Sequence, residues 1–94
     1  MTKHEDLAAI FEKKLITPYK REGVDFAKGD KAWEIAVHNE DIESSVKKLN
    51  MSHKPIKYMI VPKNKVETAL ETTEGSGIGV MSETGRIIKK ARNK

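Results

Sequence analysis

The sequence predicts a three-layer α/β domain with a mixed sheet of about five strands, in the element order αββαβαββ. Three observations support this prediction. Segments with the 3.6-residue period of a helix alternate with short apolar runs of strand length. The run over 58–61 is continuously apolar, as expected for a central strand that is covered on both faces. The segments between the later strands are long enough for helical crossovers, which favour parallel pairing.

The first predicted element is a helix over 3–15. Its apolar side chains recur at helical spacing and form one stripe, which comprises Leu7, Ile10, Phe11 and Leu15. Thr2 and Glu5 have the spacing of a capping box at its start. Pro18 is expected to mark its end, because the residue before a proline disfavours helical geometry.

A hairpin is predicted next, with strands over 24–27 and 32–37. The turn between them, at 28–31, contains Gly29 and Asp30, whose backbones readily adopt turn geometry. Because side chains alternate along a strand, the second strand divides into two sets. One set comprises Trp33, Ile35 and Val37, with Trp33 interpreted as core, and the other comprises Glu34, Ala36 and His38.

The remaining elements follow from the same signals. A second helix is predicted over 41–50, with Asn39 or Asp41 as its N-cap. After the strand at 58–61, Asn64 is expected to cap a third helix, with Glu67 completing a capping box. The glycines at 75–79 are interpreted as a helix stop and strand entry rather than a phosphate loop, which would have to open a helix. A final hairpin is predicted, with strands over 78–81 and 86–91.

Length and composition limit the class of protein. The 94 residues correspond to one domain, 1–94, whose last part, 86–94, is a basic C-terminal strand and tail. The absence of cysteine excludes disulfides, thiolate metal sites and cysteine nucleophiles. The sequence shows no apolar signal region and no run long enough to span a membrane, so we expect a cytoplasmic protein with no membrane partner. The net charge of +4 permits contact with nucleic acid without requiring it.

Two carboxylates stand out in the predicted hairpin. Asp25 lies in the first strand and Glu34 in the second, so antiparallel pairing would bring them side by side. Two neighbouring carboxylates can hold a divalent cation, and such a metal site can cleave phosphodiesters. The sequence therefore predicts Asp25 and Glu34 as metal-binding and catalytic residues.

The element order and these two carboxylates resemble the PD-(D/E)XK superfamily of restriction-endonuclease-like nucleases, which includes Holliday junction resolvases. The resemblance covers most of the chain, from the first helix to the last strand. It implies a restriction-endonuclease-like fold, Mg²⁺ as cofactor, and Asp25 and Glu34 as metal ligands. It also implies a metal-binding glutamate on the first helix, for which Glu5 and Glu12 are the candidates.

The chain departs from that family at position 36. The family's motif has a lysine two residues after the glutamate, where it helps activate the attacking water, and here that residue is Ala36. The resemblance therefore implies a catalytically degenerate member. It also leaves open an active nuclease with a displaced lysine, for which Lys31, Lys47 and Lys57 are candidates by sequence distance.

Basic residues are the candidates for contact with nucleic acid, which we expect to be DNA. The set comprises Lys47, Lys48, Arg86, Lys89, Lys90 and Arg92. Lysines and arginines on one side of a sheet form a groove for a phosphate backbone, and such binding weakens with salt. Solvated surface charge is the alternative interpretation. A third hypothesis is a protein-interaction module, in the form of a homodimer, that binds no nucleic acid.

Overall fold

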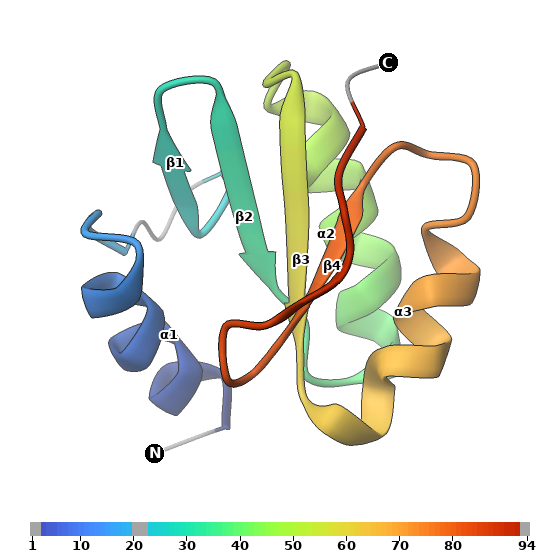
Figure 1. Cartoon of the computed structure of the whole chain (residues 1–94), viewed down its shortest axis with the longest axis horizontal. Coiled ribbons are helices and arrows are strands. Elements are labelled where there is room, and N and C mark those ends of the chain that lie inside the picture. Colours follow the sequence, from blue (N-terminus) through green and yellow to red (C-terminus); the bar gives the residue numbers. More distant parts are fainter. Residues whose placement is uncertain (1–2, 20–22, 93–94) are drawn as a thin grey trace.

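The sheet of the computed structural model has five strands whose spatial order, β1-β2-β3-β4-β5, equals their order along the chain (Figure 1). The structure describes residues 3–19 and 23–92. The helices are α1 (Lys3–Lys14), α2 (Asn39–Met51) and α3 (Val66–Thr72), with a short 3₁₀ helix, η1 (Lys63–Lys65), before α3. The strands are β1 (Phe26–Lys28), β2 (Lys31–Ile35), β3 (Ile56–Val61), β4 (Gly79–Ser82) and β5 (Ile87–Lys89). This order confirms the predicted αββαβαββ arrangement.

The sheet is mixed, as the sequence predicts. Strands β2, β3 and β4 run parallel to one another, and β1 and β5 pair antiparallel to them at the two edges. Helix α2 joins β2 to β3, and η1 with α3 joins β3 to β4, so both parallel pairs are made by helical crossovers. Strand β3 lies at the centre, in agreement with the continuous apolar run at 58–61.

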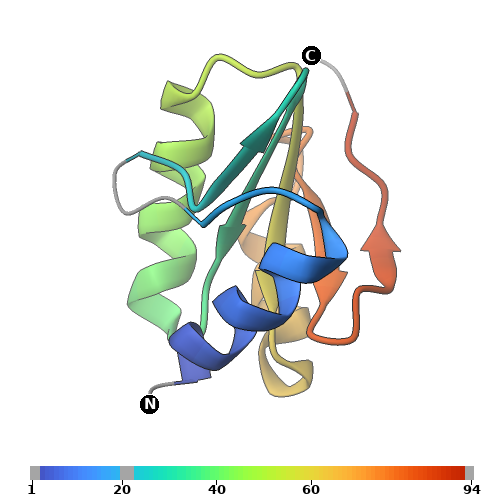
Figure 2. The same cartoon turned by 90° about the vertical axis from the view of Figure 1, so that its left-hand side faces the viewer.

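Helices cover both faces of this sheet, which gives the predicted three layers. Helix α1 lies on one face, while α2 and α3 lie on the other, and the C-terminal segment after β5 is on the α1 side (Figures 1 and 2). Within the described ranges, every helix is too short or too polar to cross a membrane.

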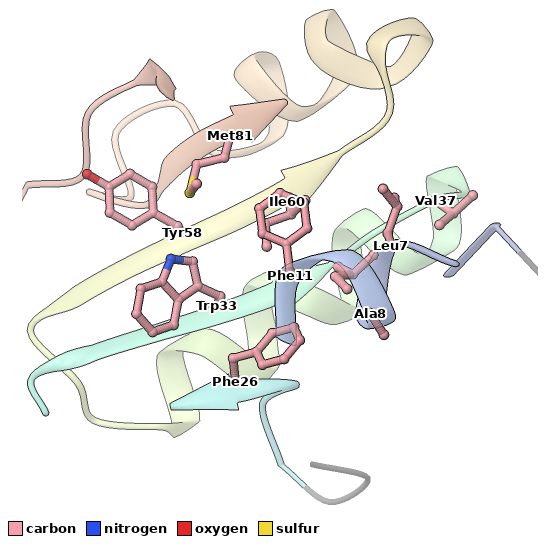
Figure 3. Packing of buried hydrophobic residues seen from close by; sticks show 10 residues of the cluster. Leu7, Ala8, Phe11, Phe26, Trp33, Val37, Tyr58, Ile60 and Met81 are labelled. Carbon is pink, nitrogen blue, oxygen red and sulfur yellow. The ribbon is translucent and has the colours of Figure 1, made fainter. Parts of the chain in front are cut away.

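The core on the α1 face contains most of the aromatic side chains. Phe11 of α1 and Phe26 of β1 are fully buried, and Trp33 and Tyr58 extend the cluster across β2 and β3 (Figure 3). Trp33 is 6% exposed, which confirms its interpretation as a core residue. Burial of large side chains of this kind is the main source of stability in a domain of this size.

The core on the other face is built from smaller and aliphatic side chains. Ile42 and Leu49 of α2 pack over Met59 of β3 and Ala36, all fully buried. Ala36 therefore occupies a position between the sheet and α2 where a long polar side chain has no room. The same face carries Glu34, one pleat away from Ala36.

Three local predictions are wrong in detail. Ile10 is 44% exposed, because the smaller Ala8 takes its place beside Leu7 and Phe11 and lets α1 approach the sheet closely. Helix α2 begins at Asn39 with His38 as its N-cap, and the Asp41 carboxylate accepts the His38 backbone N–H at 3.1 Å.

The third correction concerns the start of the third helix. Asn64 lies inside η1, where Lys65 N–H bonds the carbonyl of Pro62 at 2.9 Å, so α3 begins only at Val66. The proposed cap by Asn64 and Glu67 is therefore absent, since α3 has no side-chain cap hydrogen bond. The predicted cap by Thr2 falls outside the described residues.

The C-terminal segment packs closely onto the sheet. Ala91 lies against the α1-face core, and the backbone N–H of Arg92 donates to the carbonyl of Gly77 at 2.8 Å. Gly79 lies between this segment and Tyr58, since a Cβ built there would be 2.6 Å from the Ala91 nitrogen and 2.5 Å from the Tyr58 ring. The close approach explains why β4 begins with a glycine.

Candidate functional site

Asp25 and Glu34 lie opposite one another, as the hairpin prediction requires. The register pairs Phe26 with Trp33, and one step beyond the end of β1 brings Asp25 across from Glu34. At this step the backbone N–H groups bond to the two carboxyl side chains instead of to backbone carbonyls of the opposite strand. The Asp25 backbone N–H donates to Glu34 Oε2 at 2.5 Å, and the Ile35 backbone N–H donates to Asp25 Oδ2 at 2.8 Å. The strands thus separate at the two carboxyl groups.

Both carboxyl groups are buried. Asp25 is 7% exposed and Glu34 is 2% exposed. Burial disfavours the ionised form of Glu34, and together with the negative charge of Asp25 it raises the pKa of Glu34 to about 8, against 4.5 for an ordinary glutamate. The backbone hydrogen bond from Asp25 and the positive charge of Lys48 oppose this rise. Near neutral pH Glu34 is therefore protonated for most of the time.

Two basic side chains flank the pair, one from each helical layer. His4 of α1 places Nε2 at 3.3 Å from Asp25 Oδ2, and Lys48 of α2 places Nζ at 3.7 Å from Glu34 Oε1. The Lys48 contact is longer than a hydrogen bond, and it becomes an ion pair only when Glu34 is ionised. The four residues form one polar row from α1 through the hairpin to α2.

Lys48 is the lysine that lies beside the carboxyl pair. Its ammonium contacts Glu34, whereas no such contact is made by Lys31, Lys47 or Lys57 in the described part of the chain. Sequence distance did not indicate this contact. One signal could have indicated the contact: Lys48 is next to Leu49 and about one turn from Ser45, and both of these residues are buried on the inner side of α2. His4 was missed because it precedes the apolar stripe of α1.

A hollow of about 380 Å³ opens beside the Lys48 side chain. Val24, next to Asp25, lines it, as do Ser52 and Lys54 from the end of α2 and the loop after it. Lys54 Nζ donates to the carbonyl of Gly29 at 2.7 Å, which fixes a second ammonium near this hollow. The hollow is thus lined by two ammonium groups, those of Lys48 and Lys54, while Asp25 and Glu34 stay outside its lining.

The two carboxyl groups are donors of the kind that a hard divalent cation binds. Mg²⁺ is commonly bound by one or two carboxylates plus water, and Asp25 with Glu34 supplies two carboxyl groups from adjoining strands. Within 3–19 and 23–92, no group of three or more His, Cys, Asp or Glu residues is arranged as a metal site.

The two helical glutamates do not supply a third ligand in the described part of the chain. Glu5 is exposed on α1 and completes no such group with the pair. Glu12 accepts the Tyr19 backbone N–H at 3.1 Å and so serves the loop after α1. Water would have to fill the remaining positions around a cation.

The basic residues predicted to contact nucleic acid divide into two groups. Lys47 and Lys48 are exposed on α2, whereas Arg86, Lys90 and Arg92 are exposed in and around β5, the strand at the far edge of the sheet from the hairpin. Lys89 is half-buried and donates to the carbonyl and hydroxyl oxygens of Thr73 at 3.2 and 2.7 Å. The fold therefore offers two separate basic surfaces rather than one groove.

No protein-family model, curated protein or solved structure matches this chain.

Proposed function

We propose that this chain is a nucleic-acid-binding domain of the PD-(D/E)XK type, and that Asp25 and Glu34 hold Mg²⁺ for hydrolysis of a phosphodiester. The observation that carries the proposal is the contact of Lys48 with Glu34 at 3.7 Å. It gives the carboxyl pair a neighbouring ammonium of the kind that Ala36 cannot provide. The missing lysine at position 36 is then a displacement rather than a loss.

Each residue of the site has a distinct part in this proposal. When bound, Mg²⁺ would supply Lewis-acid polarisation of a phosphoryl oxygen and a more acidic bound water. Asp25 and Glu34 would hold the ion and balance its positive charge, for which Glu34 would have to release its proton. Lys48, which is half-exposed, can turn from Glu34 toward a phosphate oxygen and stabilise negative charge that develops there. His4 holds Asp25 from the other side.

A second candidate function is binding of nucleic acid without cleavage. It is favoured by a specific observation, namely that both carboxyl groups already accept backbone N–H groups, while burial raises the pKa of Glu34 and so favours its protonated form. Such a pair can join two strands as a structural link and need not hold metal. In that case the basic residues on α2 and around β5 would bind phosphates while the carboxyl pair stays closed.

The deciding experiment is a cleavage assay on labelled single-stranded, duplex and branched DNA and on RNA, with Mg²⁺, Mn²⁺ or EDTA. We expect metal-dependent products that fall by about 100-fold or more in Asp25→Asn, Glu34→Gln and Lys48→Met. Lys31→Met and Lys57→Met test the alternative lysines, and the exposed Lys63→Met is the matched control. Equal cleavage by wild type and all variants would mean that the activity comes from a contaminant.

The same proteins separate the two candidate functions. If none cleaves but binding of DNA or RNA weakens steeply with salt, the non-catalytic function holds. Binding should then weaken for all sequences alike when Lys89, Lys90 and Arg92 are changed to Ala. Binding that ignores ionic strength would contradict both candidates and direct attention to a homodimer, which light scattering measures directly.

A further inference from the structure

A second cavity lies far from the carboxyl pair, at the other edge of the sheet. It measures about 560 Å³ and is lined by the loop after α3 and by the C-terminal segment that follows β5. Hydrogen bonding between Arg92 N–H and the carbonyl of Gly77 holds these two segments together. The volume is within the range of about 300–1,000 Å³ that is typical of small-molecule sites.

The charged lining of this cavity is mostly positive. Lys89, Lys90 and Arg92 contribute three cations, and Glu74 contributes one carboxylate. Lys89 is fixed rather than free to swing, because Thr73 accepts two hydrogen bonds from its ammonium. An ammonium has three donors, so one remains for a ligand. Partial burial lowers the pKa of Lys89, and a bound anion would relieve this effect by favouring the charged form.

The rest of the lining is apolar. Leu70 of α3 and Ile78 before β4 form its inner wall, and Ala91 adds to it from the C-terminal segment. Ile78 is fully buried behind this wall, whereas Leu70 and Ala91 are partly exposed. A bare inorganic anion would satisfy the cations but would leave Leu70 and Ala91 in contact with water.

We propose that this cavity binds an organic phosphate, with the phosphate group held by Lys89, Lys90 and Arg92 and an apolar or flat body against Leu70 and Ala91. Arginine and lysine together suit a phosphate, since the guanidinium can bond two of its oxygens and the ammonium adds a point charge. Such a ligand has two sources, a free mononucleotide or the terminal nucleotide of a strand. The inference stands independently of hydrolysis at Asp25 and Glu34.

The test is a titration of the full chain followed by backbone amide shifts, in EDTA so that metal binding and hydrolysis play no part. The probes are AMP, adenosine, inorganic phosphate and a 5′-phosphorylated hexanucleotide. We expect AMP to bind at least ten-fold more tightly than adenosine or phosphate, with shifts at 74–78 and 89–92. If the hexanucleotide alone shifts these residues, the ligand is the end of a strand, and the site is still supported.

Variants at exposed positions keep the test independent of folding. Lys90→Ala and Arg92→Ala should each weaken AMP binding by at least about five-fold, while the exposed Lys63→Ala should leave it unchanged. Equal affinity for AMP and adenosine would overturn the proposal, as would AMP shifts confined to other parts of the chain. Absence of saturable shifts at the cavity with all four probes would also overturn it, whatever the cleavage assay shows.

Discussion

Lys48 Nζ lies 3.7 Å from Glu34 Oε1, which places an exposed ammonium of α2 beside a carboxyl group buried in the sheet. The contact joins two regions with different dielectric properties. On one side the lysine remains hydrated and can move, and on the other the glutamate is fixed by the Asp25 backbone N–H. The ionisation of Glu34 can therefore be followed through the stability of the chain, through titration and through metal binding.

Stability should fall as pH rises through the titration of Glu34. The pKa of Glu34 in the folded chain, about 8, exceeds the ordinary value of 4.5, so its stabilising contribution is complete below pH 4.5. That contribution is lost as pH rises toward 8, by an amount on the order of a few kcal/mol. Urea unfolding at pH 5 to 9 would measure the loss. The Glu34→Gln variant should show a flatter profile, and an unchanged slope would contradict the assignment to Glu34.

Changing the two charged neighbours of Glu34 should move its pKa in opposite directions. The Lys48→Met variant removes a positive charge and should raise the pKa of Glu34 further, by less than about one unit because the lysine is hydrated. Asp25→Asn removes a negative charge and should lower it. Carboxyl carbon shifts followed by NMR would report both changes, with Lys63→Met as a variant that should leave the titration where it is.

Binding of Mn²⁺ or Mg²⁺ should be linked to proton release. Because Glu34 must ionise to coordinate a cation and its pKa is about 8, the affinity should rise up to about ten-fold per pH unit between pH 6 and 8 and then level off. Calorimetry in two buffers of different ionisation enthalpy would count the released proton. An affinity that is constant over this pH range would show that the metal binds elsewhere or without Glu34.

Two neighbouring residues of α1 should differ sharply in their effect on stability. Phe11 is fully buried, so Phe11→Ala should lower the free energy of unfolding by about 3–5 kcal/mol. Ile10 is 44% exposed, and Ile10→Ala should cost less than about 1 kcal/mol. Urea denaturation of both variants measures the difference. Similar losses would mean that α1 packs with a different face on the sheet.

Gly79→Ala should destabilise the domain by about 1–3 kcal/mol, because the added methyl group overlaps Tyr58 and the Ala91 nitrogen. The strain should be relieved by displacement of the C-terminal segment. We therefore expect the Arg92 amide, which bonds Gly77, to exchange faster with solvent than in the wild type. Unchanged protection of this amide would show that the ring of Tyr58 moves instead.

Periodicity and turn chemistry predicted the order of the elements because these signals are local. The side-chain alternation around Trp33 also predicted which face of β2 belongs to each core. The carboxyl pair followed from hairpin geometry, since an antiparallel register places Asp25 opposite Glu34. What remained hidden were contacts between elements, such as those of His4 and Lys48, which depend on how the helices pack on the sheet.

The errors at the helix ends have a similar cause. Asn64 has the side chain of a good N-cap, but the chain after Pro62 first makes a 3₁₀ turn, which moves the helix start beyond it. His38 is a poor N-cap by residue type, yet it becomes one because Asp41 bonds its backbone N–H. Residue propensity alone cannot decide which residue is the N-cap when two candidates lie within one turn of the helix start.

The spatial order of the strands equals their order along the chain, and this has a consequence for how the sheet forms. Each strand pairs with the one made just before it, so no strand has to enter between two that are already joined. The two antiparallel edge pairs close short turns, whereas the two parallel pairs close helical crossovers. The hairpin that carries Asp25 and Glu34 is therefore a local part of the sheet, and the central pairs are its long-range part.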